Sequence, residues 1–165
     1  MIDQVERGRK HGREIACAIL VDTCGRFLFQ QRDNVPHIVA PGQVALFGGH
    51  REGGETFLEC LVREIHEELS YFVSPDRFAC LGRYAGPDLD RPEGSLVAEY
   101  YFARDLSVAS LDVTEGSLLV VEPSVLPILI DRFAPSSRFA VDMFSSDERC
   151  HLLHGRPNQS SGANR

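Results

Sequence analysis

Hydrophobic residues in this chain gather in short runs, and turns containing glycine, proline or acidic residues separate these runs. Runs rich in Val, Ile, Ala, Phe and Tyr are typical of β-strands. They predict six strands, at residues 14–21, 26–31, 44–47, 78–85, 96–104 and 118–121. The turn at residues 22–25 predicts that the first two strands form a hairpin. Residues 33–43 and 86–94 contain prolines and polar residues, and they predict loops, the second of them mobile.

One segment has the periodicity of a helix instead. Hydrophobic residues recur there every three or four positions and predict a single apolar stripe, made of Leu58, Leu61, Val62, Ile65 and Leu69. Thr56 followed by Glu59 is the capping-box pattern, which satisfies two backbone N–H groups at a helix start. Towards the C-terminus, prolines punctuate two further helical pieces, at residues 124–131 and 136–153.

Composition sets the class of protein. The chain has 165 residues, of which 43% are hydrophobic and 25% charged, as in ordinary globular proteins. This length predicts one domain, which we place at residues 1–153, with a polar arm or short lead-in strand at residues 1–12. Residues 154–165 are poor in hydrophobic side chains and predict a disordered tail. Strands, a helix, more strands and a terminal helix favour an α+β fold.

Charge and hydropathy exclude several classes of function. A net charge of −7 argues against general nucleic-acid binding, but a small anionic substrate is compatible with it if divalent cations bind as well. The chain has no stretch of 18 apolar residues and no signal-peptide core, which predicts no membrane span and a cytoplasmic location. The five cysteines lack zinc-site spacing and predict buried or indifferent thiols. A homodimer is possible, but no feature of the sequence locates its interface.

The predicted helix carries a row of acidic residues. Glu64, Glu67 and Glu68 are spaced i, i+3 and i+4, so their carboxylates share one face beside the apolar stripe. Like charges at this spacing repel one another, and a bound cation would offset the repulsion. Carboxylate oxygens suit Mg²⁺ or Mn²⁺. A solvated acidic surface is the plain alternative for such a row taken by itself.

The residues before this row decide between the two interpretations. The segment resembles the Nudix box, G-x5-E-x7-R-E-U-x-E-E-x-G-U, where U is a bulky apolar residue. Its positions are matched by Gly49, Glu55, Arg63, Glu64, Ile65, Glu67 and Glu68. Ser70 stands where the family has glycine, and Tyr71 stands at the last apolar position. The resemblance favours a metal site, and it implies the α/β/α Nudix fold, with a mixed sheet between helices.

The resemblance also implies roles for these residues. Glu64 and Glu68 match the principal metal ligands, and Glu67 matches a third ligand or proton acceptor. Glu55 matches an outer carboxylate that supports the metal or its water, and the backbone carbonyl of Gly48 matches a main-chain ligand. The ions expected are Mg²⁺ or Mn²⁺. The activity implied is hydrolysis of the diphosphate linkage in a nucleoside diphosphate derivative.

Three further features are left open. Arg63 is expected to reach across and hold one glutamate in place as a charge-assisted pair, so that it orients the glutamates without being a metal ligand. The general base is either a box glutamate or Glu115, although an ordinary turn explains Glu115 equally well. Arg32 matches a position that contacts substrate in some family members, although an ordinary surface arginine explains it equally well. Phe47, Tyr84 and Tyr100 could stack on a base, but aromatic residues in strands are more often core.

Substrate choice also stays open. Pro87 lies near the position of a proline in ADP-ribose-type members, whereas a nucleoside triphosphatase fits the box equally well. Two other functions share the fold, namely a non-catalytic nucleotide-sensing module and an isoprenoid diphosphate isomerase. The intact glutamate row argues against the sensing module, because a binding module does not need a metal-activated water.

Overall fold

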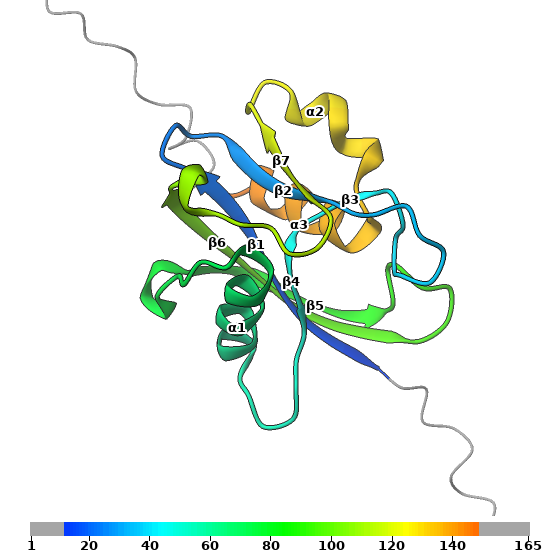
Figure 1. The fold of residues 1–165 in the computed structure, drawn as a ribbon. Helices are drawn as coiled ribbons and strands as arrows, with labels where there is room; N and C mark the ends of the chain where they lie inside the picture. The colour runs from blue at the N-terminus through cyan, green and yellow to red at the C-terminus, as the bar shows by residue number, and fades with distance from the viewer. Residues whose placement is uncertain (1–11, 149–165) are drawn as a thin grey trace, which may run out of the picture.

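One mixed sheet organises the computed structural model, which describes residues 12–148 (Figure 1). Within that range seven strands pair, with β3, β2, β1, β6 and β5 in that order, while β4 also pairs with β1 and β7 with β2. β1 and β6 run parallel and every other pair is antiparallel. The strands are β1 (Arg13–Asp22), β2 (Phe27–Gln31), β3 (Val44–Ala45), β4 (Phe47–His50), β5 (Ala79–Pro87), β6 (Ser95–Leu106) and β7 (Ser117–Val121). All six predicted strands are therefore present. The strand predicted at residues 44–47 is divided into β3 and β4, and β4 extends to His50.

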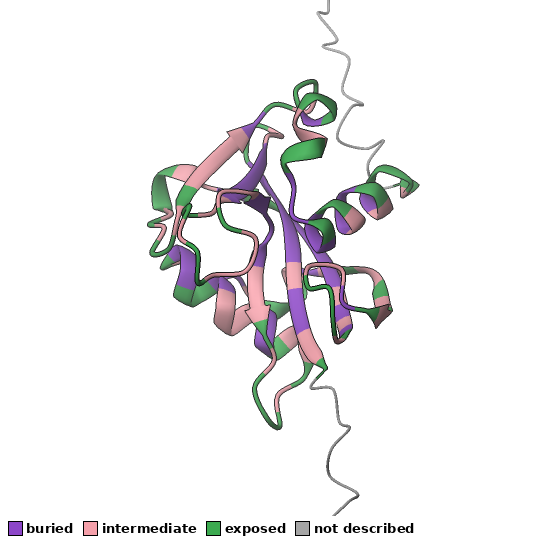
Figure 2. Ribbon diagram, turned by 90° about the vertical axis from the view of Figure 1, so that its right-hand side faces the viewer, coloured by how far each residue is buried: buried purple, intermediate pink, exposed green. Residues whose placement is uncertain are grey.

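The central strand β1 is buried on both faces (Figure 2). Because side chains alternate along a strand, Ile15 and Ile19 enter one hydrophobic cluster and Ala16 and Ala18 enter a second on the opposite face. The two alanines are small, and the face that they form is covered by the helix α1 (Phe57–Leu69).

The opposite face of the sheet is covered by the C-terminal helices. These are the short α2 (Leu126–Leu129), followed by a turn of 3-10 helix at Ile130–Arg132, and α3 (Pro135–Ser145). Leu126, Ala140 and Phe144 belong to the same cluster as Ile15 and Ile19. The sheet thus lies between α1 and the pair α2 and α3 (Figure 1), which confirms the predicted α/β/α arrangement.

Two predicted boundaries differ in the structure. β5 continues to Pro87, so the loop begins at residue 88 rather than 86, and it is tied down by ion pairs described below. α3 ends at Ser145, earlier than the predicted residue 153. The arm predicted at residues 1–12, except Gly12, and the tail predicted at 154–165 lie outside the described residues. None of the helices within 12–148 has the length and hydropathy to cross a membrane.

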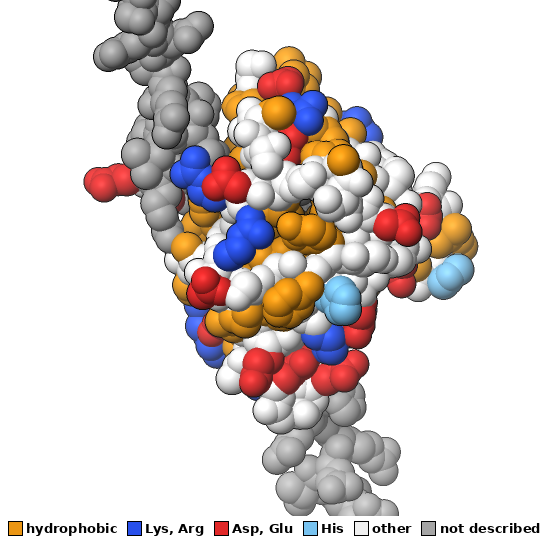
Figure 3. All heavy atoms as spheres, turned by 60° about the vertical axis from the view of Figure 1, so that its left-hand side comes forward, with side chains coloured by type: hydrophobic (Ala, Val, Ile, Leu, Met, Phe, Trp, Pro, Cys, Tyr) orange, Lys and Arg blue, Asp and Glu red, His pale blue; other side chains and the backbone are white. Residues whose placement is uncertain are grey.

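The residues of the apolar stripe of α1 differ in how far they are buried. Leu61, Ile65 and Leu69 are fully buried against the sheet. Leu58 and Val62 are only partly buried, and they line an outer groove of about 580 Å³ together with the exposed Phe72. Figure 3 views the molecule from this side and shows hydrophobic side chains in patches among charged ones.

The ends of α1 explain both its start and the departure from the family pattern. The Thr56 hydroxyl accepts the Glu59 N–H at 3.1 Å, and the Glu59 carboxylate accepts the Thr56 N–H at 2.7 Å, so the predicted capping box is formed. Ser70 follows the helix in the left-handed region, with φ 49° and ψ 31°. Tyr71 is partly buried against the α1 cluster, as an apolar position requires.

Replacing Ser70 with glycine is expected to stabilise the protein. A non-glycine residue in the left-handed region costs about 1–2 kcal/mol, and the greater freedom of glycine in the unfolded chain offsets about 0.4–1 kcal/mol of that cost. The net gain is about 0.5–1 kcal/mol, or roughly 1–4 °C in the melting temperature. Thermal unfolding followed by circular dichroism measures it, and a lower melting temperature would show that the Ser70 side chain makes a stabilising contact.

Candidate active site

A pair of glycines in β4 brings backbone and helix together. β4 runs antiparallel to β1, with Gly48 opposite Cys17 and Gly49 opposite Ala16. A Cβ atom at Gly48 would lie 2.1 Å from the Ala16 carbonyl oxygen, and Gly48 has a φ of +132°. Only glycine fits at this position, for steric and conformational reasons together.

The carboxylates of α1 lie directly against these glycines. A Cβ atom at Gly49 would be 2.5 Å from the carboxyl carbon of Glu64, so the missing side chain leaves room for that carboxylate. Glu68 accepts the Gly48 backbone N–H at 2.8 Å. The glycine turn and the acidic face of α1 therefore form one continuous polar site.

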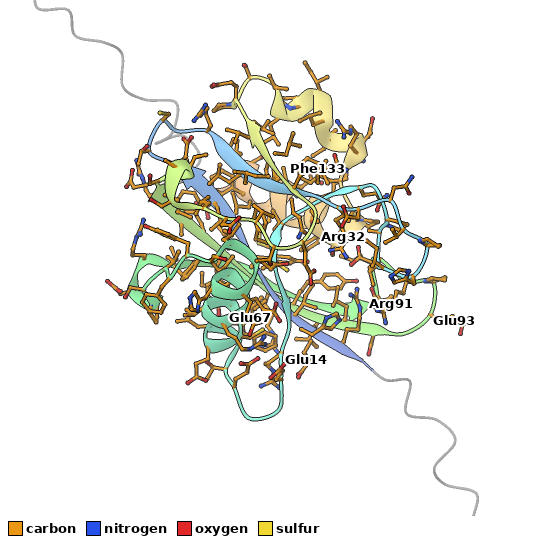
Figure 4. The ribbon with its side chains drawn as sticks, in the orientation of Figure 1. Glu14, Arg32, Glu67, Arg91, Glu93 and Phe133 are labelled. Carbon is orange, nitrogen blue, oxygen red and sulfur yellow. The ribbon has the colours of Figure 1, made fainter. Side chains whose placement is uncertain are left out.

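Arg63 donates hydrogen bonds to three carboxylates, whereas the sequence predicted a pair with one glutamate. Its guanidinium donates to both oxygens of Glu55, at 2.7 and 3.1 Å, and to Glu64 at 2.9 Å and Glu67 at 3.3 Å. It also donates to the His50 carbonyl at 3.0 Å. The bonds from Arg63 lower the pKa of Glu55 to about 2, which keeps this carboxylate charged. Figure 4 labels Glu67 on α1.

Glu68 is the most buried acidic residue of α1, with 9% of its surface exposed. Burial raises its pKa from 4.5 to about 8, and the negative charges of Glu64 and Glu115 act in the same direction. The Gly48 N–H and the positive charge of Arg32 oppose this shift. Burial likewise raises the pKa of Glu64. A buried carboxylate of this kind is stabilised in its charged form by a nearby cation.

This shift predicts how the stability of the metal-free protein depends on pH. The folded state holds the Glu68 proton up to about pH 8, whereas the unfolded state releases it near its ordinary value of 4.5. The free energy of unfolding should therefore fall as the pH rises through this window, by at most about 1.4 kcal/mol per pH unit from this group. Melting temperatures in a chelating buffer between pH 5 and 8.5 measure the slope. The Glu68→Gln variant should show a shallower slope, and an unchanged slope would exclude Glu68 as its source.

A cleft opens beside the carboxylates. One wing, of about 220 Å³, is lined at one end by Glu64, Gly49, Arg32 and Glu115. A second wing of the same volume shares Arg32 and Glu115 and extends between Gln30 and the loop at residues 33–38. Arg32 and Glu115 therefore lie where the two wings meet.

The two predicted residues at this junction are available to a ligand. The Arg32 Nε is buried and lacks a hydrogen-bond partner, and Nη1 makes only a 3.4 Å contact with Gln30. The Gln30 side chain donates to the Glu115 carbonyl at 3.0 Å, which fixes the backbone of that turn. Within residues 12–148 no protein group donates to the Glu115 carboxylate.

The aromatic residues considered for base stacking lie elsewhere. Phe47 and Tyr100 are fully buried in the core. Tyr84 packs against Phe139 and donates its hydroxyl to the Pro87 carbonyl at 2.7 Å. The interpretation as core residues is therefore confirmed for Phe47 and Tyr100. His66, also on α1, is exposed.

Sequence reasoning missed the far end of the first wing. Arg13 and Asp90 line it, together with Ser136 at the start of α3. Arg13 lies more than 70 positions from Asp88 and Asp90, so local spacing gives no signal of their contact. The one available hint was the Asp-x-Asp pattern in a proline-containing loop, since an aspartate often accepts the N–H two residues further on. The Asp88 side chain does so here and accepts the Asp90 N–H at 2.9 Å.

The residues present fit a divalent cation that keeps water ligands. Across residues 12–148, no three carboxylate, imidazole or thiol groups converge on a single ion site. Mg²⁺ is commonly held by one or two carboxylates, with waters and substrate phosphates completing its shell. Glu64 and Glu68, which the Gly49 gap and the Gly48 N–H place beside β4, supply this smaller set of oxygens.

A family comparison decides the identity of the domain. The model of the NUDIX domain matches residues 10–122, which include the glycine turn, α1 and Glu115. The chain belongs to the Nudix family. Members of this family are pyrophosphohydrolases that generally use divalent metals and act on small nucleotide substrates. A comparison with curated proteins finds no match.

Solved structures share the fold of this Nudix domain. The MutT protein from Methanosarcina mazei Go1 is 16% identical, with a TM-score of 0.67, over 86% of this chain and 99% of that one. A MutT/nudix family protein from Enterococcus faecalis is 21% identical, with a TM-score of 0.56, over 71% of this chain and 47% of that one. A bifunctional NMN adenylyltransferase/ADP ribose pyrophosphatase from Francisella tularensis, complexed with AMP and a Mn ion, is 17% identical, with a TM-score of 0.62, over 82% of this chain and 42% of that one. The chain thus spans less than half the length of the last two proteins.

Proposed function

We propose that this Nudix domain hydrolyses the diphosphate linkage of a nucleoside diphosphate derivative, with Mg²⁺ or Mn²⁺ bound by the box residues. The observation that carries the proposal is the position of the Glu64 and Glu68 carboxylates against Gly49 and Gly48, beside a cleft that contains Arg32. The Mn ion named with the Francisella protein supports the choice of cation.

The side chains that would hold the cations are Glu64 and Glu68, with Glu67, Glu55 and the Gly48 carbonyl as further oxygens. Bound divalent ions neutralise diphosphate charge and lower the pKa of an attacking water. Arg63 acts through the glutamates, since its bonds to Glu55, Glu64 and Glu67 fix where their oxygens lie.

Arg32 and Glu115 would act on the substrate from the other side of the cleft. The Arg32 guanidinium is a candidate donor for phosphate oxygens, because it matches phosphate geometry well and its Nε lacks a protein partner. Glu115 lines both wings, and a carboxylate at their junction can accept a proton from water. Glu115 is therefore our candidate for the general base, alongside the box glutamates.

A panel of diphosphate compounds with Mg²⁺ tests the proposal. We expect release of a nucleoside monophosphate from at least one compound among ADP-ribose, UDP-glucose, ATP and dGTP, and no release in a chelating buffer. Binding of these compounds without release would support a sensing module instead. Isomerisation of an isopentenyl diphosphate without phosphate release would support an isomerase.

A further inference from the structure

The far end of the cleft is built around an arginine that two aspartates neutralise. Arg13 donates Nε and Nη2 to the two oxygens of Asp88, at 2.6 and 2.7 Å, and Nη2 also to Asp90 at 2.9 Å. The side chains are almost entirely buried, with 10% of Arg13, 2% of Asp88 and 5% of Asp90 exposed. The remaining Asp90 oxygen accepts the Ser136 N–H at 2.9 Å. This cluster joins β1, the loop at residues 88–94 and α3.

The three side chains of this cluster carry a net negative charge at the far end of the first wing. One arginine and two aspartates sum to −1, and the burial of the three side chains weakens the screening of that charge by water. Arg91, on the same loop, is exposed and lines neither wing. Burial, followed by the positive charges of Arg13 and Arg91, lowers the pKa of His50, which lines the first wing. Figure 4 shows Arg91 and Glu93 extending from this loop on the side of the molecule away from α1.

The second wing offers no additional arginine or lysine. Apart from His37, its titratable lining residues are the shared Arg32 and Glu115, together with Asp33. Among the arginines of the described chain that line the two wings, Arg32 is therefore the one that forms no ion pair, whereas Arg13 is paired with two aspartates. It lies at the junction, beside the carboxylate site, whereas Arg13 lies at the far end of the first wing.

We propose that the Arg13–Asp88–Asp90 cluster makes the site selective for diphosphates that carry an uncharged, hydroxyl-bearing group on each side, and that Asp90 is its specificity-determining residue. This inference rests on the proposed function. A substrate that ends in a free phosphate would place that phosphate in a wing whose lining is negative. Like charges brought together in a partly buried site disfavour binding.

The same cluster supplies hydrogen bonds for a sugar. Asp90 lines the wing, and each of its carboxylate oxygens accepts one hydrogen bond and retains a lone pair for a second. The Arg13 Nη1 takes part in none of the bonds to the two aspartates. Neighbouring acceptor and donor groups of this kind suit vicinal hydroxyls, each of which can donate and accept. A site built to bond hydroxyls discriminates strongly against a ligand that leaves its polar groups unpaired.

ADP-ribose and ATP form a matched pair for the test, because both carry adenosine and differ in the group beyond the diphosphate. With Mg²⁺, we expect the kcat/KM of the wild-type protein to be at least about tenfold higher for ADP-ribose. Asp90→Asn keeps the side-chain shape and an oxygen for the Ser136 N–H but removes the charge. This variant should lower the ratio of kcat/KM for ADP-ribose to kcat/KM for ATP about tenfold. Asp131→Asn removes the same charge from an exposed side chain outside the cleft, and it should leave the ratio unchanged.

The outcomes separate this inference from the proposed function. An equal or higher kcat/KM for ATP, or an unchanged ratio in Asp90→Asn, would overturn the inference while the proposed function stands. If the protein hydrolyses none of the diphosphate compounds, both the inference and the proposed function are overturned. If circular dichroism shows that Asp90→Asn does not fold, Asp88→Asn provides the same readout, because it leaves both Asp90 bonds in place.

Discussion

Glutamine at position 64 or 68 is expected to abolish turnover without unfolding the protein. The substitution keeps the size of each side chain and removes one negative oxygen from the site beside Gly48 and Gly49. Loss of one electrostatic group at a reacting centre commonly lowers kcat about 10²- to 10³-fold. The amide oxygen at position 68 can still accept the Gly48 N–H, and the variant needs neither a proton nor a cation to remain uncharged at this buried position. Its stability should therefore be maintained.

Three measurements decide this prediction. Steady-state hydrolysis gives kcat, Mn²⁺ binding followed by electron paramagnetic resonance gives the ion affinity, and circular dichroism reports the fold. Glu122→Gln is the matched control, because Glu122 is exposed and lies in neither α1 nor the cleft lining. Full activity in both α1 variants would reject these glutamates as metal ligands.

Alanine at position 49 should have an effect almost as large, although it changes no charged group. The new Cβ would lie 2.5 Å from the Glu64 carboxyl carbon, so this side chain would have to leave its position. A displacement of about 1 Å at a catalytic group can cost about a hundredfold in rate. We expect kcat to fall by that order, with a weaker affinity for Mn²⁺ as the accompanying change.

Gly53→Ala is the appropriate control for this substitution. A Cβ atom at Gly53 meets no atom within 4 Å, in the same turn that leads from β4 to α1. Its activity should equal that of the wild-type protein. If Gly49→Ala were equally active, the close approach of Glu64 to β4 would not matter for the reaction.

The sequence predicted most of the fold because its strands and α1 carry strong local signals. The β-branched run of β1, the Thr56–Glu59 box and the prolines before α3 each act within a few residues. The parallel pairing of β1 with β6 could not be predicted, because it joins strands about 80 positions apart. Residue 86 was wrongly taken as the start of the next loop, since pairing with β6 extends β5 to Pro87.

In the candidate site, too, the sequence predicted the residues with local spacing and missed those that meet only in the folded chain. The Nudix box found the residues on β4 and α1, whose spacing is local. It did not reveal that Leu58 and Val62 face an outer groove or that Arg63 holds three carboxylates, because both depend on how the chain packs around α1. The Arg13 cluster was missed altogether, since it forms only when β1, a distant loop and α3 meet. The metal-ligand roles, the cytoplasmic location and a homodimer stay predictions.

The arrangement around Arg63 has a practical consequence for purification. Its guanidinium already balances part of the negative charge of Glu55, Glu64 and Glu67 by direct hydrogen bonds. Protein stripped of ions during preparation should therefore keep these side chains in order and regain activity soon after Mg²⁺ is returned, without a slow refolding phase.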